Sequence, residues 1–212
     1  NDGMESDSIL FVPSEEVIAD KDVILSEGKY RSIKSSFESA FEIVQLDDVC
    51  KTITDGTHKT PKYTSEGIPF LRVTDITKSN SSKKFISKEE HLELIKRCKP
   101  EKGDILFSKN GTIGVAELVD WDYEFSIFVS LCLLKPYKEK ILSRYLKELM
   151  NSQNVYRQAV NYSKSGTVTN LHLVEIKKIK IPLPPIEVQK EIVDELEGYQ
   201  KIIDGCRQVV EN

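Results

Sequence analysis

The most constraining feature of this sequence is a group of three prolines placed directly before a long run of helix-forming residues. Pro182, Pro184 and Pro185 lie within four positions, and the chain then continues without glycine or proline until Gly198. Proline fixes φ and lacks an amide hydrogen, so it stops a strand and is tolerated in the first turn of a helix. The segment therefore predicts a short strand that ends at the prolines and a helix that begins near Glu187.

Apolar side chains recur along this helix with the alternating spacing of four and three residues that a coiled coil uses. They are Ile192, Leu196, Tyr199, Ile203, Cys206 and Val210. Two alternatives remain open: the helix packs on its own domain, or it packs on another helix. The set is narrow and runs almost to Asn212, which favours another helix as the partner, including one from a second copy of this chain.

The bulk composition is that of a globular chain without a membrane span. Its 212 residues suffice for one sizeable core, or for a core with an appendage. No apolar run approaches the roughly 18–20 residues that a membrane-spanning helix needs. The four cysteines lie far apart with no CxxC pair, so no metal site or disulfide framework is expected. These features predict a protein of the reducing cytoplasm with no membrane partner.

Charge is distributed unevenly along the chain. The net charge is −4, but residues 1–50 contain 4 Lys and Arg against 12 Asp and Glu, whereas residues 51–110 contain 13 against 8. One interpretation is ordinary surface variation. The other is a basic region that meets phosphate groups, with the acidic residues placed elsewhere.

Between the N-terminal segment and the final helix, short apolar runs alternate with turn residues. This sequence pattern predicts a mixed α+β domain with a small twisted sheet and flanking helices. The expected strands are 49–53, 69–73, 105–108, 113–119, 125–136 and 176–184. The expected helices are 87–98, with Ser87 as N-cap and Glu90 closing a capping box, and 143–162.

Five motifs follow one another along residues 44–212. They are DGTHKTPKY (55–63), GIPFLRVTDI (67–76), KGDILFSKNGTIG (102–114), SGTVTNL (165–171) and IPLPPIEVQKEIV (181–193). In this order and spacing, they resemble the specificity subunit of type I restriction-modification enzymes. The resemblance implies a target recognition domain that reads one half of a bipartite DNA sequence. It also implies a long helix that sets the spacing between halves and docks methyltransferase subunits.

The resemblance implies three regions: an appendage at 1–43, a target recognition domain at 44–184 and a spacer or dimerisation helix at 185–212. Residues 1–43 lie outside the five motifs, but VIADKDVILSEGKYR resembles the tail of an N6-adenine methyltransferase. That would make this chain the C-terminal part of a methyltransferase–specificity fusion. The family usually has Glu-Gln where this chain has Val188-Gln189, a difference that affects a local cap or partner contact.

The candidate DNA contacts fall on four polar segments, whose hydroxyl, amide, imidazole and ammonium groups can meet phosphates and base edges. The first segment is a loop with Thr54, Asp55, Gly56, Thr57, His58, Lys59 and Lys62. The second lies at the end of the expected strand 69–73, where Arg72 and Thr74 alternate outward. The others are a hairpin turn with Lys109, Asn110 and Thr112, and a loop with Lys164, Thr167 and Asn170. The alternatives also stay open: plain turns, in which Asp55 bonds its own backbone, and an ordinary surface position for Arg72.

The sequence shows no catalytic pattern. Its three histidines are scattered, no glycine-rich cofactor loop is visible, and Glu175-Ile176-Lys177 lacks the Pro-Asp that would precede it in a nuclease motif. We therefore expect a non-catalytic module that binds double-stranded DNA and directs an N6-adenine methyltransferase and a restriction subunit to the target. S-adenosylmethionine, ATP and magnesium are implied for the partner subunits, and no cofactor for this chain. The alternative is a protein-interaction module that assembles through its C-terminal helix without binding DNA.

Overall fold

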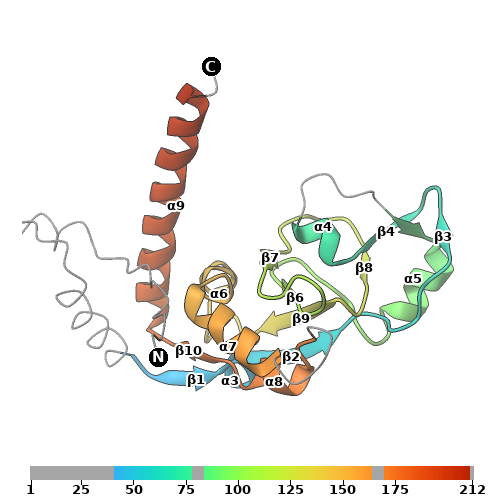
Figure 1. Ribbon diagram of the computed structural model, residues 1–212, viewed down its shortest axis with the longest axis horizontal. Coiled ribbons are helices and arrows are strands. Elements are labelled where there is room, and N and C mark those ends of the chain that lie inside the picture. Colours follow the sequence, from blue (N-terminus) through green and yellow to red (C-terminus); the bar gives the residue numbers. More distant parts are fainter. Residues whose placement is uncertain (1–40, 78–83, 164–169, 211–212) are drawn as a thin grey trace, which may run out of the picture. The chain divides into compact units, whose positions relative to one another are not determined.

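The computed structural model describes residues 41–77, 84–163 and 170–210 (Figure 1). The segment that resembles a methyltransferase tail falls within residues 1–40, outside the described residues, and so do Lys164 and Thr167. From Ile43 onward the chain forms one compact unit. Its elements mix helices with small sheets and end in a long helix, so the predicted α+β class is confirmed.

The central sheet is antiparallel and buried on both faces. Its strands, in spatial order, are β2 (Cys50–Asp55), β9 (Leu131–Pro136), β6 (Ile105–Ser108) and β7 (Ala116–Leu118). Side chains alternate between faces along a strand. Ile105 and Phe107 of β6 therefore join one apolar cluster, whereas Leu106 joins the other. Burial of both faces explains why Leu131 to Leu134 of β9 are continuously apolar rather than alternating.

A second small sheet contains β3 (Tyr63–Thr64), β5 (Phe85–Ile86), β4 (Ile68–Leu71) and β8 (Ser126–Ile127). The prediction of one strand over 125–136 is wrong, because β8 and β9 are separate strands in different sheets. Between them, Leu131 N–H donates to the Phe128 carbonyl at 2.9 Å, which closes a turn. Phe128 N–H donates to Leu71 O, and Val129 N–H to Thr57 O, so the residues of this turn pair with two other segments.

The predicted strand 69–73 is also shorter than expected. β4 ends at Leu71, and Val73 already begins α4 (Val73–Thr77), so Thr74 is a helical residue. The Asp75 carboxylate accepts hydrogen bonds from the backbone N–H of Arg72 at 2.8 Å and from its Nε at 3.1 Å. Arg72 and Thr74 therefore do not alternate along a strand, and this part of the prediction is wrong.

Two helices replace the single helix predicted over 143–162. They are α6 (Ser143–Met150) and α7 (Gln153–Ser163). The break lies at Asn151, whose side chain accepts from Ala116 N–H and donates to Ala116 O, both at 2.9 Å. Asn151 thereby completes the pairing at β7, and Ser152 bonds the first turn of α7 by accepting from Val155 N–H.

The remaining short elements connect the two ends of the domain. β1 (Ile43–Gln45) pairs antiparallel with β10 (Lys180–Pro182) and leads into α3 (Leu46–Val49), while α8 (Leu173–Lys177) precedes β10. The predicted final strand 176–184 is therefore reduced to β10. The helix predicted at 87–98 is α5 (Lys88–Leu94), and Ser87 caps it as predicted by accepting from Glu90 N–H at 3.2 Å.

The C-terminal helix α9 (Ile186–Val210) begins directly after Pro185, as the sequence predicts. Its first turns pack on the domain: Gln189 is fully buried and Val193 nearly so. Farther along, Leu196 and Ile203 are 41% and 45% exposed. No helix among the described residues is long and apolar enough to cross a membrane.

Candidate nucleic-acid interface

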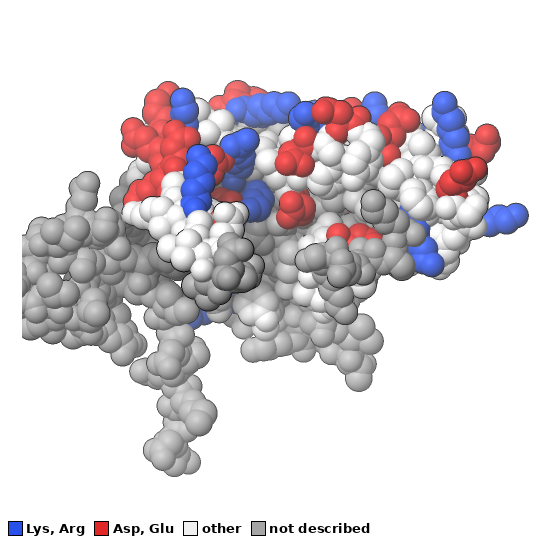
Figure 2. Space-filling view, turned by 90° about the horizontal axis from the view of Figure 1, so that it is seen from above, with Lys and Arg blue, Asp and Glu red and all other residues white. Residues whose placement is uncertain are grey.

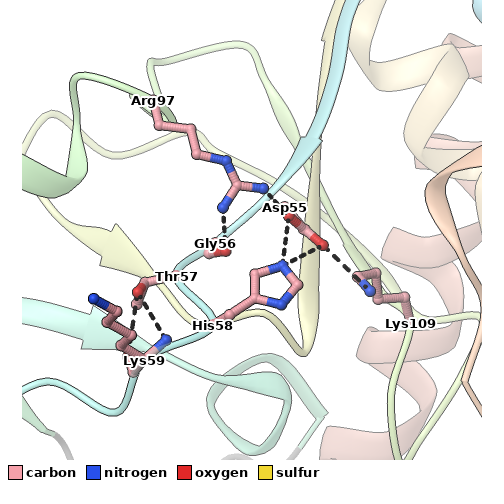
Figure 3. Close-up of polar contacts among 7 residues, drawn as sticks. All are labelled: Asp55, Gly56, Thr57, His58, Lys59, Arg97 and Lys109. Atoms are coloured by element: carbon pink, nitrogen blue, oxygen red, sulfur yellow. Dashed lines mark hydrogen bonds and ion pairs between the residues drawn. The ribbon is translucent and has the colours of Figure 1, made fainter.

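A buried carboxylate, Asp55, collects three nitrogen-bearing side chains at the end of β2 (Figure 3). Its oxygens lie 2.5 Å from Arg97 Nη2, 3.4 Å from Lys109 Nζ and 3.4 Å from His58 Nε2. We call Asp55, His58, Arg97 and Lys109 the Asp55 cluster. The side chains of Asp55 and Lys109 are only 4% and 5% exposed, whereas those of His58 and Arg97 are 63% and 56% exposed. The cluster therefore has an internal ion pair and an outer edge that carries an imidazole and a guanidinium.

The backbone holds the first predicted loop in place immediately after Asp55. Gly56 N–H donates to Leu131 O at 3.3 Å, Thr57 N–H to Ile127 O at 3.1 Å, and Val129 N–H to Thr57 O at 3.0 Å. A Cβ at Gly56 would lie only 2.0 Å from Ile127 O, so this close approach requires glycine. Positive φ is not the reason for glycine here, because among the described glycines only Gly67, Gly103, Gly111 and Gly114 have positive φ.

The third predicted segment reaches the Asp55 cluster through Lys109. Its backbone N–H donates to Ser130 O at 3.0 Å, and its carbonyl accepts from Leu171 N–H at 2.9 Å. Asn110 and Asn170 form an antiparallel bridge next to it. The structure thus brings together the ends of β2 and β6 and the segment at Asn170, which lie far apart in the sequence. Thr112 is exposed in the loop beyond this bridge.

Lys59 and Lys62 are exposed on the loop that leaves the cluster, and Thr54 is half-buried in β2. The Thr57 hydroxyl accepts from Lys59 N–H at 3.2 Å, which orders the turn after His58. Lys62 N–H donates to the Glu90 carboxylate at 3.2 Å and so ties the loop to α5. Because both ammonium groups face solvent, they can reach a polyanion, in contrast to the buried Lys109.

The second predicted segment, with Arg72 and Thr74, forms its own polar contacts at the start of α4. Arg72 pairs with Asp75, whose side chain is only 6% exposed, and Val73 N–H donates to the Ser130 hydroxyl at 3.1 Å. Ser130 therefore connects the start of α4 to Lys109. Within this arrangement Arg72 fixes a helix start, while the Thr74 hydroxyl is buried.

Arg97 is the member of the cluster that sequence reasoning missed. It lies in the turn after α5, where its N–H donates to Leu94 O, and it meets Asp55 across 42 positions of sequence. The Lys96-Arg97 pair is the only signal in the sequence, and it is typical of the end of a helix. The pairing with Asp55 follows from the fold alone.

The surface around these elements carries charges of both signs. Figure 2 shows Lys and Arg side chains standing among Asp and Glu side chains rather than in a uniform positive field. The basic excess of residues 51–110 is partly neutralised by carboxylates from other segments, as where Lys102 pairs with Asp122 at 2.9 Å. Positive charge available to a ligand depends on which cations remain exposed, as Lys59, Lys62 and Arg97 do.

The described residues offer no metal site, and the three buried thiols are not activated. No group of three or more His, Cys, Asp or Glu side chains could hold a metal ion within the ranges that the structure describes. Burial raises the pKa of the Cys50 and Cys98 thiols to about 12, so both stay protonated at neutral pH. Burial also raises the pKa of Cys132. A neutral, buried thiol is a poor nucleophile and a poor ligand.

Comparison with known proteins identifies the architecture. The family described as "Type I restriction modification DNA specificity domain" matches residues 38–212. The chain belongs to this family. Specificity subunits are non-catalytic, so the prediction that this chain is not an enzyme is confirmed by its family. The five motifs on which the predicted resemblance rests all lie inside the matched residues.

Individual relatives agree with the family. The chain is 30% identical over 187 residues to the type I restriction enzyme MjaX specificity subunit of Methanocaldococcus jannaschii, covering 81% of this chain and 42% of that protein. It is 31% identical over 150 residues to the type I restriction enzyme EcoBI specificity subunit of Escherichia coli, covering 69% and 31%. The chain thus spans between about a third and a half of the length of these specificity subunits.

Solved structures share the fold. A chain from a type I restriction-modification system aligns with a TM-score of 0.62 at 20% identity, covering 82% of this chain and 45% of that one. The HsdS subunit from Thermoanaerobacter tengcongensis aligns with a TM-score of 0.57 at 19% identity, covering 80% and 44%. The family fold therefore spans most of this chain and a little under half of each solved chain.

Proposed function

We propose that this chain recognises double-stranded DNA through the surface around the Asp55 cluster, as the specificity component of a type I restriction-modification enzyme. The observation that carries the proposal is the meeting of the first and third predicted segments with the turn after α5 at one buried carboxylate. His58 and Arg97 lie at its exposed edge, and the exposed Lys59 follows on the adjoining loop. Side chains of this kind contact phosphates and base edges. A rigid backbone frame beneath them provides the fixed register that sequence reading requires.

The assembly is the second part of the proposal. Family membership supports a role in directing an N6-adenine methyltransferase and a restriction subunit to the target, in the cytoplasm where the DNA lies. The outer turns of α9 expose Leu196, Tyr199 and Ile203, which form an apolar surface suited to another helix. That helix would come from a methyltransferase subunit, a second recognition half or a second copy of this chain. S-adenosylmethionine, ATP and magnesium would be bound by the partner subunits.

A salt titration of DNA binding tests the recognition role. The chain should bind a short mixed-sequence duplex with an affinity that falls steeply with salt, because each neutralised phosphate releases counterions. Replacing Lys59 and Lys62 by Ala should reduce the slope of log affinity against log salt by about one for each phosphate that is no longer neutralised. Lys178 and Lys180, which are exposed near β10, provide the matched control pair.

Two results would count against this assignment. An unchanged slope in the Lys59 and Lys62 variant would remove this loop from the interface. Absence of salt-dependent binding in the parent chain would favour the alternative function, a protein-interaction module that assembles through α9 without DNA.

A further inference from the structure

Arg97 differs from Lys109, the other cation of the Asp55 cluster, because it is both fixed and exposed. Its Nη2 lies 2.5 Å from Asp55 Oδ1, and its Nη1 donates to Gly56 O at 3.4 Å. A guanidinium has five N–H donors in a planar fork, so these two hydrogen bonds leave three donors. With more than half of the side chain in solvent, those donors are available to an external acceptor.

The charge balance of the cluster leaves Arg97 without full compensation. Asp55 supplies one negative charge, and the two permanent cations Lys109 and Arg97 both pair with it. A buried ammonium needs a counter-ion, because its desolvation is otherwise costly. Lys109 is buried with Asp55, so the internal pair accounts for that negative charge. The cluster therefore carries a surplus of one positive charge, and Arg97 is its exposed cation.

We propose that Arg97 contacts a phosphate of the bound DNA and that Asp55 is the positioning residue that holds it there. This inference rests on the proposed function. Arginine suits the task because its fork can bind two phosphate oxygens while its other edge stays on a carboxylate and a carbonyl. Asp55 then acts through Arg97 and His58 rather than by touching DNA, which agrees with its burial.

The role of Asp55 determines whether its replacement strengthens or weakens DNA binding. Asp55→Asn makes the chain more positive by one charge. Electrostatic attraction alone would then strengthen DNA binding at every salt concentration. If Asp55 positions Arg97 and His58, the same change weakens binding, because the amide is neutral and replaces one of the two acceptor oxygens by a donor nitrogen, so the guanidinium and the imidazole are oriented less firmly. The two roles therefore predict opposite directions.

The first experiment measures the salt dependence of binding of the 212-residue chain to a mixed-sequence DNA duplex. Arg97→Gln should reduce the slope by about 0.9, the value expected for one phosphate. The matched control is Lys96→Gln, which removes the same charge from the neighbouring position, where the ammonium is exposed and pairs with Glu93. It should leave the slope unchanged. Equal effects of the two variants would overturn the proposal, because general charge would then explain both.

Further variants separate charge from geometry. Arg97→Lys keeps the charge and removes the fork, so it should bind more weakly than the parent; full parental affinity would overturn the positioning role of Asp55. Asp55→Asn should also bind more weakly, and tighter binding overturns that role. Because Asp55→Asn leaves Lys109 buried without a partner, its folding is checked by thermal unfolding beside the double variant Asp55→Asn, Lys109→Met. If Asp55→Asn does not fold, the Arg97 and Lys96 variants decide the matter.

DNA binding by the parent chain distinguishes a failure of the Arg97 proposal from a failure of the proposed function. If it binds the duplex with a steep salt slope while Arg97→Gln matches Lys96→Gln, the Arg97 proposal fails and the proposed function stands. If the parent shows no salt-dependent binding, the proposed function fails and the Arg97 contact is overturned with it.

Discussion

The side-chain oxygen of Gln189 accepts a hydrogen bond from the backbone N–H of Leu142 at 2.8 Å. Leu142 is the N-cap of α6, and its side chain makes no capping bond. The amide nitrogen of Gln189 donates to Lys140 O at 3.0 Å and to Pro184 O at 2.9 Å. One buried amide of α9 thus joins the start of α6 to the proline segment, and it fixes how the long helix leaves the domain.

Replacing Gln189 by Leu should lower the free energy of unfolding by about 3 kcal/mol, because it leaves buried backbone groups without partners. Denaturant unfolding followed by circular dichroism measures this decrease. Gln200→Leu is the matched control, since Gln200 is exposed on the same helix and its amide donates to Asp204 one turn farther along. A decrease of similar size in the control would refute the special role of Gln189.

The outer turns of α9 give a prediction about assembly. Leu196→Asp combined with Ile203→Asp should abolish self-association or methyltransferase docking, because charges cannot be buried in an apolar helix interface. The domain should stay folded, since both side chains are about two-fifths or more exposed. Sedimentation and co-purification measure the result. Lys201→Asp with Gln208→Asp alters exposed positions of the same helix as a control. Assembly of the first variant at parental strength would show that this apolar set is not an interface.

Two residues are the candidates for reading bases. His58 and Asn110 both combine a donor with an acceptor, as contacts to base edges in the major groove require. His58 is exposed, whereas the side-chain oxygen of Asn110 is buried in the free chain and must turn outward to reach a base. Replacing a base-reading residue by Ala should relax the preference at one position by about 1–3 kcal/mol. Methylation sequencing in cells that contain the complete enzyme detects this change, with the exposed Asn154 of α7 as the control for Asn110. An unaltered methylated site in both variants would remove both from base readout.

Glycine substitutions separate close packing from helix propensity. Gly56→Ala should lower the free energy of unfolding by at least about 2 kcal/mol, because the new Cβ would collide with backbone atoms of Ile127 and Phe128. Gly198→Ala should instead raise it by up to about 1 kcal/mol, because nothing lies near that position and alanine is the better helix former. Chemical denaturation of both variants tests the contrast. Equal effects of the two substitutions would contradict it.

The buried His91 should make the stability of the chain depend on pH. Its Nδ1 lies 2.9 Å from the Ser126 hydroxyl, and its Nε2 is buried. Burial lowers the pKa of this imidazole, against a smaller raising effect of Glu124 and with a further lowering effect of Lys88. The unfolded chain therefore takes up the proton first as pH falls. The contribution of His91 to the free energy of unfolding is constant above the ordinary histidine pKa of about 6.5. It is lost progressively as the pH falls below that value toward the pKa of the folded state.

Unfolding titrations between neutral and mildly acidic pH should show this decrease in stability, and His91→Gln should flatten it. His172→Gln, which removes an exposed imidazole, is the matched control, and an equal flattening in this variant would contradict the assignment to the buried His91. A parental slope in the His91 variant would mean that other groups cause the pH dependence.

The sequence by itself determined the features that depend on neighbouring residues. The prolines mark where α9 begins, and Ser87 caps α5, because a missing amide hydrogen or a nearby hydroxyl acts within a few positions. The order of the five motifs was sufficient to predict the family. The apolar spacing of α9 predicted its exposed surface, but the buried Gln189 of its first turn was not predicted.

Only the tertiary structure decided which polar residues act together. Asp55, Arg97 and Lys109 have no periodicity or spacing in common, and they meet because β2, β6 and the turn after α5 end at the same place. The same kind of long-range pairing broke the apolar run 125–136 into two strands, since Phe128 and Val129 bond segments around Leu71 and Thr57. Local propensity cannot foresee such bonds, because the energy of a contact between distant residues depends on the whole fold that places them.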